Sequence, residues 1–170
     1  MSRPLQTDAY FGQHYIALTR GDTALEVVNN HKAEILAFYT GLPAEKANYA
    51  YAEGKWTIRE LLQHLIDAER VFTYRATRIA RKDTTPLPGF DENSYAANSM
   101  ADKRDFNSLK EEFTALRNAT DIFISSLSED QLQQPGNSSG KYITANAIAF
   151  IIYGHLLHHI NIIKERYLAA

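Results

Sequence analysis

Apolar residues recur at the 3.6-residue spacing of an α-helix in four long stretches of this sequence. The spacing predicts helices over about residues 23–39, 57–81, 104–126 and 144–168, with a shorter helix over 9–17 before the first. No stretch keeps the alternation of apolar and polar residues that is typical of a half-buried strand. The pattern therefore favours an all-helical protein.

Residues at the predicted helix ends support these boundaries. Gly41 and Pro43 end the first helix, because glycine favours a helix C-terminus and proline cannot continue one. Thr57 and Glu60 form a capping box that starts the second helix, and Thr144 is a suitable N-cap for the fourth. Trp56, just before the capping box, is expected to anchor the helix start by packing.

The connection between the second and third helices is about two dozen residues long and contains the breakers Pro86, Pro88 and Gly89. A connection of this length in a compact domain is usually functional or has some structure of its own. Residues 86–95 could form a lid over a site, or a crossover packed on the helices, which we favour. Four amphipathic helices with one long connection predict a four-helix bundle in a single domain, residues 1–170.

Composition excludes several classes of function. The chain has 170 residues, a formal charge of −2 and a pI near 6.3, so it lacks the basic character expected of a nucleic-acid-binding domain. It contains no cysteine, which rules out disulfides and thiolate metal ligands. The first residues form no apolar signal segment. We expect a cytoplasmic protein with no nucleic-acid partner and no membrane association.

One apolar stretch is long enough to test that expectation. Residues 142–163 contain no Asp, Glu, Lys or Arg, and about 20 apolar residues can cross a bilayer. The stretch also contains Asn146, His155, His158, and other polar residues, which are costly at membrane depth unless they are paired. We therefore expect a helix buried inside a bundle.

Three histidines in the most apolar helices are the main candidates for chemistry. His155 and His159 are four residues apart, which places both rings on one helix face about one turn apart. His64 lies on the second helix, and the three imidazoles could bind a divalent metal ion with coordination positions left open. The alternative is three core histidines, each hydrogen-bonded to a carbonyl group or a water molecule. Without partners, each buried ring would cost roughly 1–3 kcal/mol.

Neighbouring residues narrow the chemistry of such a site. Leu156 occupies the position of the glutamate in an HExxH metalloprotease, and no Glu-x-x-His motif of a di-iron bundle is present. Asp67, three residues after His64, could be a metal ligand, a general base or a residue that orients a ligand, or it could be an ordinary solvated carboxylate. Glu69 and His158 are expected to point away from the metal cluster.

Three segments together resemble the DinB superfamily, in its DinB-like and YfiT-like branch: GKWTIRELLQHLIDAERVF, PLPGFDENSYA and IIYGHLLHHINIIKERYL. The resemblance covers about residues 8–168. It implies a four-helix bundle with a long crossover between the second and third helices. It also implies a metal site at His64, His155 and His159, with nickel or zinc as the expected ion, and a homodimer.

The resemblance leaves several functions open. Some members of the wider superfamily transfer or isomerise small molecules with a low-molecular-weight thiol, which implies a metal-dependent thiol S-transferase. A metal-dependent hydrolase, with Asp67 as the base, is the second possibility. A non-catalytic, metal-binding, stress-associated protein is the third. In the two enzymatic cases the partner is a small-molecule substrate.

Overall fold

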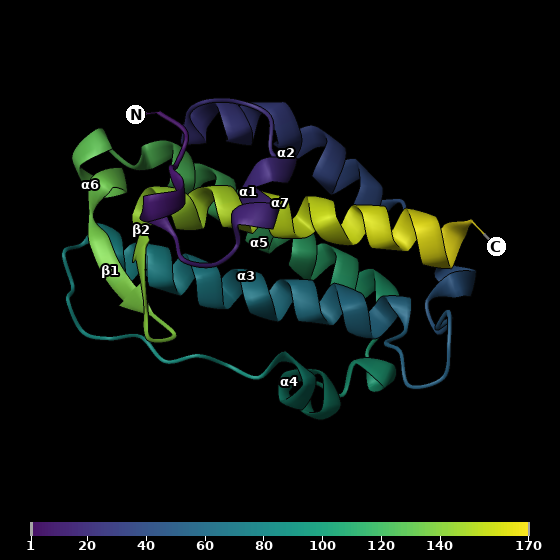
Figure 1. Ribbon diagram of the computed structural model, residues 1–170. Helices are drawn as coiled ribbons and strands as arrows, with labels where there is room; N and C mark the ends of the chain where they lie inside the picture. The colour runs from purple at the N-terminus through teal and green to yellow at the C-terminus, as the bar shows by residue number, and fades with distance from the viewer. Residues whose placement is uncertain (1, 170) are drawn as a thin grey trace.

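Four long helices dominate the computed structural model, which describes residues 2–169 (Figure 1). They are α2 (Ala24–Thr40), α3 (Ile58–Ala80), α5 (Phe106–Ser126) and α7 (Ala145–Ile162), and α7 continues into one π-helical segment, η4 (Ile163–Leu168). Shorter elements are η1 (Gln6–Asp8), α1 (Gln13–Leu18), η2 (Ala44–Lys46), α4 (Glu92–Asn98), η3 (Ala101–Lys103) and α6 (Glu129–Gln133). The four predicted long helices are confirmed.

The long helices form a bundle in which α2 and α3 each pack against both α5 and α7. Helix α3 and helix α5 run in the same direction, so the chain between them must return along the length of the bundle (Figure 1). This return is the predicted long crossover. The expected all-α four-helix bundle is therefore confirmed.

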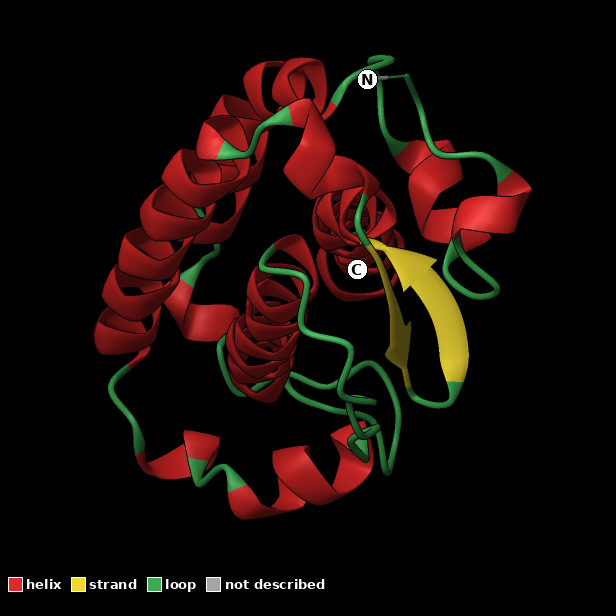
Figure 2. Cartoon of the chain, turned by 90° about the vertical axis from the view of Figure 1, so that its left-hand side faces the viewer, coloured by secondary structure: helices red, strands yellow, loops and turns green. Residues whose placement is uncertain are grey.

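The bundle also carries a small β-hairpin that the sequence analysis did not predict. Strands β1 (Pro135–Ser138) and β2 (Lys141–Thr144) pair antiparallel at one side of the bundle (Figure 2). Ser139 and Gly140 connect the strands, both with positive φ (55° and 76°), as a tight hairpin turn requires. The expectation of no strand was wrong because Pro135–Ser138 contains no large apolar side chain, so the first strand shows no alternation.

The crossover is attached to this hairpin. The Leu87 amide donates to the Asn137 carbonyl at 3.0 Å, and the Leu87 carbonyl accepts from the Ser139 amide at 2.9 Å. Further along, Asp91 caps α4, which packs against α3. The segment is thus a crossover packed on the bundle, as the sequence interpretation favours, and it brings Phe90 and Glu92 alongside α3.

Helix α7 lies in the centre of the hydrophobic core. It begins at the expected cap, where the Thr144 hydroxyl accepts a hydrogen bond from the Ala147 amide at 3.1 Å. The segment Ala145–Leu168 is long and apolar enough to cross a membrane, but 78% of its most apolar window is buried inside the protein. This burial is what the sequence analysis expects of a core helix, and it makes α7 a rigid support for the residues it carries.

Candidate metal centre

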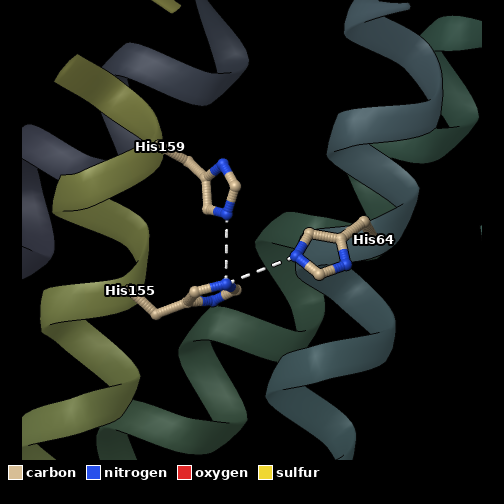
Figure 3. A group of neighbouring side chains, drawn as sticks. All are labelled: His64, His155 and His159. Carbon is tan, nitrogen blue, oxygen red and sulfur yellow. Dashed lines mark hydrogen bonds between the residues drawn. The ribbon is translucent and has the colours of Figure 1, made fainter. Parts of the chain in front are cut away.

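Helices α3 and α7 pack side by side and bring the three candidate histidines together (Figure 3). His64 projects from α3, while His155 and His159 project from successive turns of α7. His64 and His155 are buried, at 8% and 6% exposure, and His159 is largely covered. One ring nitrogen from each residue lies within 4.8 Å of the other two.

The spacing of the ring nitrogens fits a shared metal ion. His155 Nε2 lies 3.3 Å from His64 Nε2 and 3.1 Å from His159 Nε2. Ligands about 2.0–2.1 Å from a tetrahedral ion are separated by roughly 3.3 Å. The rings meet edge to face, with interplanar angles of 73° and 87° at His155, so their nitrogens converge without ring overlap. Two of the three separations therefore match those around a bound divalent cation, and the third pair of nitrogens lies within 4.8 Å.

Hydrogen bonding alone does not satisfy this cluster. His155 Nε2 faces two ring nitrogens at once, but a neutral imidazole nitrogen carries either one N–H or one lone pair. In either state it makes only one good hydrogen bond, and the second contact can only share the same proton or lone pair. A metal ion accepts all three lone pairs, so it satisfies the three nitrogens better than hydrogen bonds among the rings do.

The surroundings keep the three rings neutral, as metal ligation requires. Burial lowers the pKa of His64 to about 4. Burial and then the charges of His64 and His158 lower the pKa of His159 to about 3. Burial, followed by the charges of His159 and His64, holds the pKa of His155 well below its usual range. At neutral pH each ring therefore offers a lone pair.

The histidines face a cavity of about 270 Å³. Besides the three ligands, its walls include Tyr15, Trp56, Phe72, Phe90, Glu92 and His158. The walls are mainly aromatic, with one carboxylate and one phenol. Such a space beside three ligands leaves room for a small molecule at open metal positions.

Gly154 explains how α1 reaches this site. A Cβ atom at Gly154 would lie 2.0 Å from the Tyr15 carbonyl oxygen, so only glycine allows α1 to pack this closely on α7. The contact sets the Tyr15 ring edge-on to His155 and His158, at centroid distances of 5.3 and 5.4 Å. Burial, and then the charge of Glu92, raises the pKa of Tyr15, which keeps the phenol protonated.

Asp67 is not brought to the histidines. Its carboxylate accepts a hydrogen bond from Gln63 at 3.0 Å, lies 3.9 Å from Arg70, and is not part of the cavity wall. Burial raises its pKa. A side chain three positions further along a helix points about 60° away from the first. Asp67 is therefore turned away from His64 and contacts Gln63 and Arg70 instead.

Glu92 of α4 is instead the carboxylate in the cavity wall, and sequence reasoning missed it. It lies in the predicted crossover, where no helical register indicates which way a side chain points. Trp56 was expected to serve only as a packing anchor, but its ring lies 4.8 Å from the His64 ring and also lines the cavity. His158 lies outside the cluster of ligand nitrogens, as expected, yet it borders the cavity.

Comparisons with known proteins agree with this description. The chain is 27% identical over 146 residues to an Oceanobacillus iheyensis protein named "Putative metal-dependent hydrolase OB0413", covering 82% of this chain and 79% of that protein. The fold of this chain matches that of YfiT from Bacillus subtilis with a TM-score of 0.71 at 18% identity. The match covers 93% of this chain and 86% of YfiT. YfiT is described as "a probable metal-dependent hydrolase with an unusual four-helix bundle topology".

A family model adds the last observation. The model of the DinB superfamily matches residues 28–163, which include all three clustered histidines and the crossover. The matched range covers most of the chain, and the fold and the histidine cluster agree with it. This protein therefore belongs to the DinB superfamily.

Proposed function

We propose that this protein is a metal-dependent hydrolase of a small molecule. His64, His155 and His159 hold a divalent ion, and the adjoining cavity takes the substrate. The observation that carries the metal site is the position of His155 Nε2, which faces two other ring nitrogens and can make a good hydrogen bond to only one of them. The names given to the two relatives support the choice of hydrolysis.

The donor set narrows the choice of metal. Three neutral imidazoles suit zinc and nickel, whereas calcium and magnesium prefer oxygen ligands. Neutral ligands also leave the charge of the ion undiminished. Bound there, such an ion would supply Lewis-acid chemistry, by polarising a carbonyl group or lowering the pKa of a water molecule.

The residues of the cavity provide the remaining parts of a hydrolytic site. Glu92 can accept and return a proton, which takes over the role that the sequence analysis gave to Asp67. Tyr15, with its raised pKa, offers a phenolic O–H that can donate to a substrate oxygen. The cavity has an apolar wall that limits the access of water, formed by Trp56, Phe72 and Phe90.

Metal content tests the first half of this proposal. Mass spectrometry of the untagged protein should find close to one zinc or nickel ion per chain, and His64→Gln and His159→Gln should both lose it. His158→Gln is the matched control for metal content, because its ring is adjacent in sequence but outside the cluster. Absence of metal, with no thermal shift when zinc, nickel or manganese is added, would overturn the proposal.

Turnover tests the second half. The metal-loaded protein should hydrolyse members of an ester and amide panel without any added thiol, and a chelator should stop the reaction. Glu92→Gln should lower kcat while metal content stays intact. The thiol S-transferase stays a prediction, and a parallel assay with a thiol and an electrophile distinguishes the two. Turnover only in that assay would show the hydrolase proposal to be wrong.

The oligomeric state of the protein is tested separately. The homodimer expected from the family resemblance stays a prediction, which sedimentation of the untagged protein checks.

A further inference from the structure

A second cavity, of about 290 Å³, lies beside the metal centre along α3. Its walls come from α3, from the crossover and from α4, and they include Val71, Tyr74, Leu87 and Phe90. Phe90 also borders the cavity at the histidines, so the two spaces are neighbours that share one wall. The second cavity is mainly apolar, but it contains one buried cation.

That cation is Arg75, which is only 5% exposed. Its guanidinium donates to the Pro88 carbonyl at 2.7 Å and to the Ser139 hydroxyl at 3.3 Å, and it lies 5.7 Å from the centre of the Phe90 ring. All of these partners are uncharged. Within residues 2–169, no carboxylate forms an ion pair with Arg75.

A buried charge without a counter-ion is costly, and folded proteins normally pair it. Burial lowers the pKa of Arg75, but a guanidinium that starts near 12.5 remains charged at neutral pH. The other arginine in the wall, Arg70, is paired with Glu112 at 2.5 Å. The wall itself contains no Asp or Glu. None of the described residues supplies a negative charge to Arg75, so an anion bound in the cavity would serve as its counter-ion.

We infer that this cavity binds a small aromatic carboxylic acid, with the carboxylate on Arg75 and the ring against Val71 and Phe90. The planar fork of an arginine matches the two oxygens of a carboxylate, and the apolar wall suits an aromatic body. The binding does not depend on the metal. Only the further step, that such an acid is part of the substrate and extends toward the histidines, rests on the proposed function.

Binding of 3-phenylpropanoate tests the inference, with 3-phenyl-1-propanol as an uncharged probe of nearly the same shape. Both are titrated by calorimetry into the full chain, before and after chelation of metal. Chelation removes direct carboxylate–metal contact as an explanation, and it separates this test from that of the hydrolase. We expect the acid to bind the chelated protein at least tenfold more tightly than the alcohol.

Three variants locate the site. Arg75→Gln should weaken binding of the acid at least tenfold and leave the alcohol unaffected. Arg81→Gln makes the same charge change at an exposed position at the end of α3 and should bind like the natural protein. Val71→Phe keeps Arg75 but fills the cavity, and it should also lose the acid.

The same titrations can overturn the inference. Equal affinity for the acid and the alcohol, no binding of either, or unchanged binding of the acid by Arg75→Gln would each do so. Arg75 also supports the crossover through Pro88, so that variant is first checked by circular dichroism. If it is unfolded, Val71→Phe decides the matter, and unchanged acid binding there overturns the inference.

Discussion

Two buried polar clusters lie on different faces of α3, and they differ in how their polar groups are paired. On one face, His64 meets two further histidines beside a cavity. On the other face, Glu69 forms an ion pair with Arg117 at 2.9 Å, and both side chains are only 2% exposed. Arg117 also pairs with Asp121, whose carboxylate accepts from the Tyr153 hydroxyl at 2.5 Å. Helix α7 contributes to both clusters.

In the second cluster one buried cation, Arg117, is paired with two carboxylates. Burial alone would lower the pKa of Arg117, but the neighbouring Glu69 carboxylate raises it above its ordinary value. In the histidine cluster burial lowers the pKa of each ring, and for His155 and His159 the neighbouring histidines lower the pKa further. The difference indicates which cluster is structural. Groups of opposite charge that pair with each other support the fold, while three ring nitrogens that converge beside a cavity are suited to bind a ligand.

Breaking the ion cluster should have the largest effect on stability. Arg117→Met leaves Glu69 buried without its cation, so the free energy of unfolding should fall by about 3–5 kcal/mol. The double variant Glu69→Leu/Arg117→Met removes both charges and should recover much of the loss. Urea denaturation of the three proteins measures this. A single variant as stable as the natural protein would show that the cluster is not structural.

Metal binding at the histidine cluster should have the next largest effect on the free energy of unfolding. A zinc or nickel concentration 100 times the Kd should raise the free energy of unfolding by about 3 kcal/mol, because only the folded chain presents the three nitrogens together. His155→Gln should abolish the increase, since His155 is the central ring. Thermal denaturation with and without metal checks this, and an equal shift in the variant would contradict it.

Acid should destabilise the metal-free protein through the same rings. The pKa of His64 is about 4 and that of His159 about 3 in the folded state, both below the value near 6.5 in the unfolded chain. As pH falls below 6.5 the unfolded state therefore binds more protons than the folded state, and the free energy of unfolding decreases. Between pH 7 and pH 5, the titration of each ring should lower the free energy of unfolding by about 2 kcal/mol.

Urea denaturation at the two pH values measures that loss. His64→Gln removes one titrating ring, so its stability should depend less on pH by about the same 2 kcal/mol. The Arg81→Gln variant is a useful control, because it changes an exposed residue outside the histidine cluster. A pH dependence unchanged in His64→Gln would mean that the ring is not held neutral by the fold.

The smallest expected effect concerns a buried hydroxyl group on α5. The Thr120 hydroxyl is buried, at 1% exposure for the residue, and has no hydrogen-bond partner among the described residues. Thr120→Val removes this group at nearly constant shape, so it should raise the free energy of unfolding by about 1 kcal/mol. A loss of stability in the same denaturation assay would show that the hydroxyl has a partner in solution.

Local pattern was enough to predict the helices and half of the metal centre. Periodicity located the four long helices, and the capping residues Thr57 and Thr144 mark where two of them begin. The spacing of His155 and His159 places both on one face of α7 without any knowledge of the fold. These features depend on residues a few positions apart, which is the range over which helical geometry is set.

Only the tertiary structure decided the rest. The ring of His64 meets those of α7 because two helices distant in sequence pack together, and Gly154 allows Tyr15 to approach them. Glu92, which the sequence analysis did not single out, lines the cavity in place of Asp67, since the turn of α3 and the path of the crossover settle which carboxylate reaches it. Helical periodicity states which residues share a face, but packing between distant segments determines what each face meets.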